Sequence, residues 1–120
     1  MPDASEEALL RRKALQFLVH SFLYYKLGEP VVSDSFFDQL SEELRSLREK
    51  YPEAEMPYTD LIEPALGPEA SAFQLKTYPP RIISTAFKLL YTVNAPDMDF
   101  MEFVERRGYQ AQLDPELATA

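Results

Sequence analysis

The sequence predicts an all-α protein built on an antiparallel hairpin of two long helices. Two stretches carry apolar residues at every third or fourth position, and residues that start or stop helices bound each stretch. Only six residues, 28–33, separate the two stretches, and connections this short usually place helices antiparallel. Six of the ten prolines then lie between Pro52 and Pro80, where they forbid a long helix and deprive any strand of hydrogen-bond donors. The length of 120 residues suits one domain.

The first helix is expected from Glu6 to Leu27. Ser5 is the expected N-cap, and the acidic residues that follow it suit the positive end of a helix. Gly28 is suited to end the helix because glycine adopts the left-handed conformation at little cost, and Pro30 follows. The apolar face and its flank are formed by Leu10, Ala14, Phe17, Leu18, Ser21, Tyr24 and Tyr25.

The second helix has equally clear ends. Ser33 is the expected N-cap, Asp34 opens the first turn, and Pro52 follows the last turn at once. The apolar residues repeat every three or four positions, which is typical of a helix with one buried face. They are Phe36, Leu40, Leu44, Leu47 and Tyr51.

The rest of the chain is expected to cover this hairpin. The proline-rich segment is expected to be extended, with a short turn of helix near Ser71–Leu75. An apolar pattern runs from Ile82 to Tyr91, and a short helix is expected from Asp97 to Arg107. Phe100, Phe103 and Val104 are expected to face inward from it. The single domain 1–120 is thus divided into a helical hairpin (1–51), a proline-rich wrap (52–81), short helices (82–107) and a frayed tail (108–120).

Composition excludes several classes of function. Twelve basic against twenty acidic residues give a net charge of −8, which argues against direct nucleic-acid binding, because that needs clustered cations. There is no cysteine and one histidine, His20, so we expect no disulfide, no cysteine nucleophile and no metal site. No apolar run approaches about 18 residues, and the acidic start does not resemble a signal peptide. We therefore expect a cytoplasmic protein with no membrane contact.

The chemistry-bearing residues are concentrated where the two helices meet. Asp34 and Asp38 are four apart and share one helical face, with Phe37 on the flank of that face. In an antiparallel hairpin, Tyr24 and Tyr25 come close to this first turn. The result is a mouth with aromatic walls and two acids at its rim, which suits a flat, electron-poor ligand such as a pyridinium.

A purely structural interpretation of the same residues stays open. Carboxylates in a first turn are favoured by the helix dipole alone, by about 0.3–1 kcal/mol each. Tyrosines at the end of a helix often pack at the edge of a core with their hydroxyls in water. Spacing alone does not separate these two interpretations.

The same segment resembles the N-terminal Ia domain of bacterial NAD-dependent DNA ligases. That family carries Tyr-(Tyr/His), a linker with proline, Asp, two residues, Tyr-Asp, then Leu-x-x-Glu-Leu and (Tyr/His)-Pro-Glu. The matching residues are Tyr24, Tyr25, Pro30, Asp34, Phe37, Asp38, Leu40, Glu43, Leu44, Tyr51, Pro52 and Glu53. A weaker similarity continues through Pro57–Thr59, Pro80–Phe87 and Phe100–Arg107.

The resemblance implies a helical domain that binds the nicotinamide mononucleotide (NMN) half of NAD. It implies that Tyr24 and Phe37 face the nicotinamide ring, and that Tyr25, Asp34 and Asp38 make polar contacts to the carboxamide, ribose or phosphate. In the family this domain presents the pyrophosphate to a lysine of the following adenylation domain. Two departures matter: the family has tyrosine where this chain has Phe37, and the 120 residues contain no Lys-x-Asp-Gly adenylation motif. The chain is therefore not expected to ligate DNA by itself.

Two functional hypotheses follow from these observations. The first is a stand-alone NMN- or NAD-binding module that acts in trans with a separate ligase adenylation domain in DNA repair or replication. The second is a small acidic helical protein that binds or inhibits a nucleic-acid enzyme, in a phage or mobile-element setting, because an acidic surface can occupy a groove made for nucleic acid. A fragment of a longer ligase is less favoured, since residues 114–120 do not resemble the strand that leads into an adenylation site.

Overall fold

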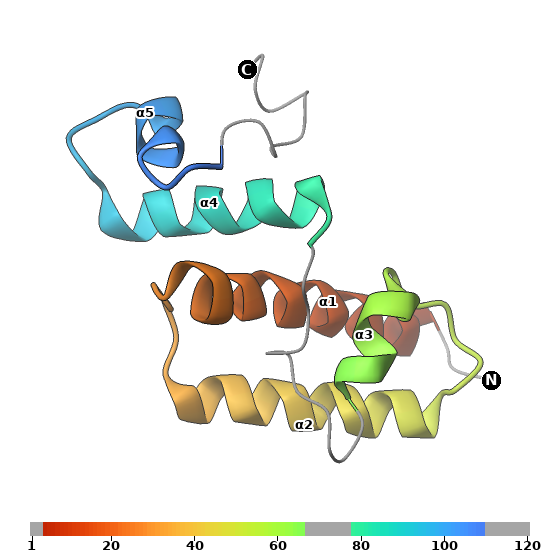
Figure 1. The fold of residues 1–120 in the computed structure, drawn as a ribbon. Helices are drawn as coiled ribbons and strands as arrows, with labels where there is room; N and C mark the ends of the chain where they lie inside the picture. Colours follow the sequence, from red (N-terminus) through yellow and green to blue (C-terminus); the bar gives the residue numbers. More distant parts are fainter. Residues whose placement is uncertain (1–3, 67–77, 110–120) are drawn as a thin grey trace.

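The computed structural model describes residues 4–66 and 78–109, and these form an all-helical fold without a strand, as predicted (Figure 1). Within the described ranges, no helix is both long and apolar enough to cross a bilayer. The elements are α1 (Ala4–Ser21), the π-helix η1 (Phe22–Leu27), α2 (Asp34–Lys50), α3 (Thr59–Ala65), α4 (Pro80–Asn94) and α5 (Phe100–Glu105).

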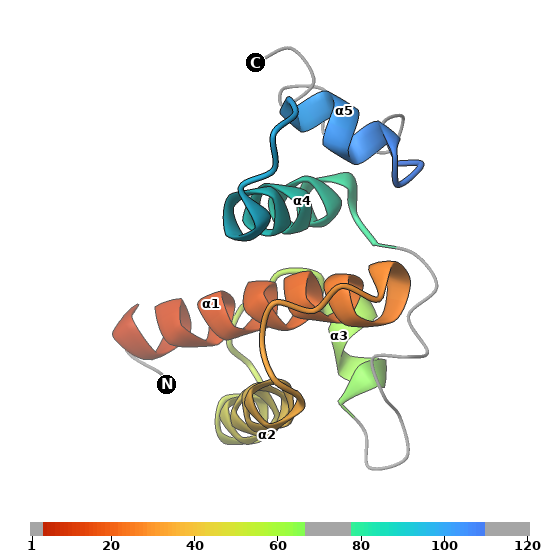
Figure 2. The same cartoon turned by 90° about the vertical axis from the view of Figure 1, so that its left-hand side faces the viewer.

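Helix α1 is the central element of the fold. Helices α1 and α2 form the expected antiparallel hairpin, and α4 covers the opposite side of α1, with α5 stacked beyond α4 (Figures 1 and 2). Because α1 has neighbours on two sides, it buries consecutive residues such as Phe17, Leu18 and Val19 rather than one narrow stripe. The sequence predicted the stripe that faces α2 and only part of the face that contacts α4.

The ends of the hairpin helices are set by local signals. Ser33 caps α2, since its side chain accepts a hydrogen bond from the backbone N–H of Phe36 at 3.1 Å. Gly28 ends η1 in the left-handed conformation, with φ of 66°. The prediction of Ser5 as the N-cap of the first helix was wrong, because α1 already includes Ala4 and Ser5 lies inside the helix.

The buried face of α2 also differs from the expectation. Phe37 is only 7% exposed, whereas Phe36, which was expected on the apolar face, is 49% exposed. Leu40 and Leu44 are buried as expected. Phe37 is the buried residue of the pair because its ring lies parallel to that of Phe17 on α1, with ring centroids 5.8 Å apart.

The proline-rich segment contains a helix that the sequence did not predict. Helix α3 includes Pro64 and buries Ile62 and Ala65. Two arginines of α2 hold this region: Arg45 donates to the carbonyl of Leu66, and Arg48 donates both to the carbonyl of Ala54 and to Glu63. The expected turn at residues 71–75 lies outside the described residues.

The C-terminal helices were predicted as helices, but their lengths differ from the prediction. Helix α4 has 15 residues and starts at Pro80, so it is longer than the apolar run that predicted it. Helix α5 is shorter than expected and begins after Asp99, whose side chain accepts from the N–H of Glu102 at 2.9 Å. Phe103 and Val104 are buried as predicted.

Gly28→Ala is expected to lower the free energy of unfolding by about 1 kcal/mol, because a Cβ is disfavoured in the left-handed region. No heavy atom lies within 4 Å of the added Cβ, so the cost comes from the backbone rather than from a clash. Urea unfolding followed by circular dichroism measures this loss. Gly28→Asn is the matched variant, since asparagine tolerates this conformation better, and a loss larger than that of alanine contradicts the interpretation.

Candidate functional site

The two tyrosines of the candidate site lie on the π-helix η1. The backbone N–H of Gly28 bonds to the carbonyl of Leu23, five residues earlier, so this turn contains more residues than an α-helical turn. Consecutive side chains therefore diverge less, and the rings of Tyr24 and Tyr25 meet edge to face at 4.8 Å. Single π-turns are frequent at functional sites. No signal in the sequence predicted this one.

The N-terminus of α2 supplies the acidic residues. The cap at Ser33 fixes where the helix begins, and this places Asp34 and Asp38 one turn apart on the same exposed face. A helix N-terminus adds partial positive charge from its free N–H groups. The site therefore combines two carboxylates with a helix end that favours anionic groups.

Tyr24 interacts with Asp34 across the connection between the two helices. The carboxylate of Asp34 raises the pKa of Tyr24, first by its charge and then by accepting a hydrogen bond from the phenol. The pKa of Tyr25 is also raised, chiefly by its partial burial and then by the charges of Asp38 and Asp34. The structure thus brings together the tyrosines of one helix and the acids of the next.

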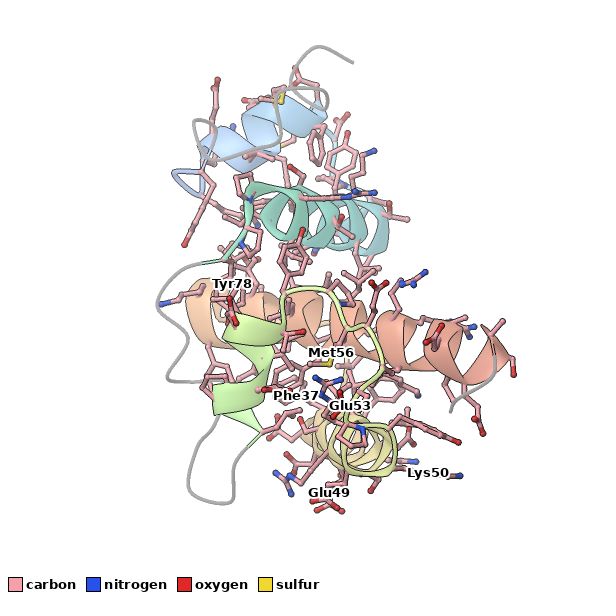
Figure 3. All side chains as sticks on the ribbon, turned by 90° about the vertical axis from the view of Figure 1, so that its right-hand side faces the viewer. Phe37, Glu49, Lys50, Glu53, Met56 and Tyr78 are labelled. Carbon is pink, nitrogen blue, oxygen red and sulfur yellow. The ribbon has the colours of Figure 1, made fainter. Side chains whose placement is uncertain are left out.

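Phe37 supports this site from beneath. Its ring is nearly parallel to those of Phe17 and Tyr24, with centroid distances of 5.8 and 5.9 Å and interplanar angles of 8° and 9°. Figure 3 shows Phe37 in the space between α1 and α2. Tyr25 contacts the same ring edge to face at 6.1 Å. Phe17 is the member of this stack that sequence reasoning assigned only to the core.

The stack determines which ring faces a ligand can reach. An inserted aromatic ring needs about 7 Å between the two rings that hold it, twice the usual carbon–carbon contact of about 3.5 Å. The centroids of Tyr24 and Phe37 are 5.9 Å apart, so no ring fits between them in this conformation. A ligand ring placed between Phe37 and Tyr24 would require Tyr24 to move. The half-exposed tyrosines provide the accessible aromatic surface.

A shallow groove of about 680 Å³ runs from Asp38 along the seam between α1 and α2. Its wall includes Lys13, which pairs with Glu43 at 2.6 Å. Sequence reasoning did not predict this groove, because it depends on how the two helices pack.

His20 lies beside the site without joining it. It is half-buried, which lowers its pKa, and its ring meets Phe36 edge to face at 6.2 Å. Among the described residues, no group of histidine, aspartate and glutamate is arranged to hold a metal ion.

Part of the chain is similar to DNA ligases. Residues 1–58 match the family described as "DNA ligase-like, N-terminal NAD+-binding domain". A DNA ligase of Salinibacter ruber is 34% identical over 83 residues, which cover 69% of this chain and 12% of the ligase. A DNA ligase of Desulforamulus reducens is 37% identical over 59 residues, covering 48% of this chain and 9% of the ligase.

The chain therefore corresponds to a small part of these enzymes, and a third DNA ligase, from Fervidobacterium nodosum, matches over 38% of this chain and 6% of its own length. The comparison with solved structures found no match. All five residues of the candidate site lie inside the matched range. Residues 1–58 thus match the family of DNA ligase-like, N-terminal NAD+-binding domains, as the motif between Tyr24 and Glu53 predicted.

Proposed function

We propose that this chain binds the NMN half of NAD at Tyr24, Tyr25, Asp34 and Asp38. The observation that carries the proposal is the interaction between Tyr24 and Asp34, which joins an aromatic surface to a carboxylate at a helix N-terminus. These residues come from the range that matches the NAD+-binding family.

Each group has a chemical task in this proposal. The tyrosine rings stack on the cationic nicotinamide ring, and a cation–π contact contributes about 0.5–2 kcal/mol. The carboxylates accept hydrogen bonds from ribose hydroxyls or from the carboxamide, each worth about 1.5–3 kcal/mol. The free N–H groups at the start of α2 favour the phosphate. Together these contacts fix the orientation of the nucleotide.

Orientation is the contribution that such a module makes to catalysis. Holding the pyrophosphate in line with an attacking lysine makes the reaction effectively unimolecular. The 120 residues contain no Lys-x-Asp-Gly motif, so the nucleophile must lie outside them. We propose that it belongs to a separate ligase adenylation domain with which this chain acts in trans. Mixing the protein and NAD with an adenylation domain that lacks its own Ia segment, and measuring adenylylated lysine by mass spectrometry, tests this step.

Asp34→Asn is expected to raise the Kd for NMN about tenfold, because a charge-assisted hydrogen bond becomes a neutral one. Isothermal titration calorimetry with NMN and with NAD measures the change. Asp60→Asn is the matched control, since Asp60 is also an exposed acid in the first turn of a helix, α3. Equal affinities of wild type and Asp34→Asn would remove Asp34 from the site, and no heat from wild type at millimolar NMN would end the proposal.

The alternative, an acidic protein that binds or inhibits a nucleic-acid enzyme, is favoured by one observation. Phe37 is buried and stacked with the rings of Phe17 and Tyr24, whereas Phe36 beside it exposes half of its surface. An exposed aromatic ring among acids suits a protein partner with a basic groove. The same calorimetric experiment separates the two functions, because only the first requires wild type to bind NMN.

A further inference from the structure

A bidentate ion pair joins the candidate site to the C-terminal part of the chain. Arg107 donates from Nε to one carboxylate oxygen of Glu29 at 2.8 Å and from Nη2 to the other at 3.0 Å. The two residues are 78 positions apart in the sequence. Two parallel hydrogen bonds fix the orientation of the guanidinium relative to the carboxylate as well as the distance between them, which a single contact does not.

Arg107 is itself held in place. Its Nη1 donates to the carbonyl of Phe103 at 3.1 Å, and its guanidinium carbon lies 3.9 Å from the centre of the Phe103 ring. Phe103 is buried and contacts the rings of Phe87 and Tyr91 on α4. The guanidinium is therefore anchored to the layer formed by α4 and α5.

Glu29 occupies the connection that sets the geometry of the candidate site. Its backbone N–H bonds to the carbonyl of Leu23 at 2.9 Å, at the end of η1. The same connection continues to Ser33, the cap of α2. Residues 28–33 therefore join the element that carries the tyrosines to the element that carries the acids.

We propose that Arg107 is a positioning residue. By binding the carboxylate of Glu29, it holds the 28–33 connection so that Tyr24 and Asp34 face each other. This inference rests on the proposed NMN site and adds a requirement to it. Arg107 lies outside residues 1–58, just after α5, so ligand binding by the family-like segment depends on the C-terminal part of the chain. The hydrogen bonds also lower the pKa of Glu29, which keeps the carboxylate charged.

The experiment compares Arg107→Ala with Arg106→Ala in the full chain. Arg106 is the matched control because, among the described residues, its side chain pairs only with Glu102 one turn earlier, at 3.0 Å, and both side chains are exposed. Arg107→Ala is expected to raise the Kd for NMN on the order of tenfold, and Arg106→Ala less than about twofold. Arg107→Lys keeps the charge but not the two parallel hydrogen bonds, so its affinity is expected to lie between wild type and alanine.

A second measurement does not need the ligand. Tyrosine labelled with ¹³C reports the pKa of Tyr24 by NMR, with Tyr24→Phe to assign the signal. In wild type, Asp34 raises this pKa. In Arg107→Ala the Tyr24–Asp34 contact loosens, so the pKa is expected to fall toward the ordinary value of 10.0. Loss of stability alone does not move the pKa of a tyrosine in molecules that circular dichroism shows to be folded.

The outcomes are distinct. Unchanged NMN affinity in folded Arg107→Ala overturns the positioning role, whatever happens to Tyr24. If wild type does not bind NMN, the proposed function fails, and the pKa of Tyr24 still decides whether the ion pair sets this geometry. If Arg107→Ala does not fold, Glu29→Gln replaces it, because that change removes the charge and keeps the shape of the side chain.

Discussion

Phe22→Ala is expected to lower the free energy of unfolding by about 3–5 kcal/mol. Phe22 is 1% exposed and contacts the rings of Tyr78, Phe87 and Tyr109 at 5.3, 5.9 and 5.3 Å. These rings lie just before α4, within α4 and after α5, so they cannot all move inward to fill the cavity. A domain of this size has a total stability of about 5–15 kcal/mol, so the loss is a large fraction of it. Urea unfolding followed by circular dichroism measures the change.

Phe36→Ala is the matched control for this prediction. The side chain is of the same type, but it is 49% exposed, and its alanine variant is expected to cost less than about 1 kcal/mol. Equal losses in the two variants would contradict the structure, because they would mean that α4 and the residues around it do not pack on η1.

The hairpin was predictable because its signals are local. Ser33 and Gly28 mark the ends of helices through their own backbone chemistry, and both are found in these roles. Which of Phe36 and Phe37 is buried does not depend on local sequence signals. Either residue continues to Leu40 at helical spacing, so the apolar pattern fits both. The ring of Phe17 on the neighbouring helix decides it, and no pattern within α2 contains that information.

Helix α3 shows a second limit of sequence reasoning. Seven residues with an internal Pro64 have little helical stability of their own. Contacts from Arg45 and Arg48 on α2 stabilise the segment, and these depend on the tertiary structure. Prolines argued correctly against a long helix here but not against a short one. The proposed division into units at residues 51, 81 and 107 stays a prediction.

The residues of the candidate site were predicted better than its shape. Tyrosines and acids at the two sides of a short connection must come close once the hairpin forms, and Tyr24 and Asp34 do. The π-turn that directs the tyrosines and the two rings that stack with Phe37 result from packing. Arg107 was not assigned to the site from sequence, since nothing in the chain predicts a partner 78 residues away.

Tyr24→Ala is expected to raise the Kd for NMN on the order of a hundredfold, because the ligand loses its stacking partner and Asp34 loses the phenol that orients it. Isothermal titration calorimetry measures the loss. Tyr51→Ala is the control for a tyrosine at the far end of α2, and its affinity for NMN is expected to change less than about twofold.

Tyr24→Phe separates the contribution of the ring to NMN binding from that of the hydroxyl. It keeps the stacking surface and the support of Phe37 but removes the hydrogen bond to Asp34, so the Kd is expected to rise only about 2- to 10-fold. If alanine and phenylalanine weaken binding equally, the ring does not stack on the ligand and the tyrosine serves only to orient the acid. If neither weakens binding, NMN binds elsewhere on the chain, because any ligand that uses the exposed aromatic surface of η1 must contact this ring.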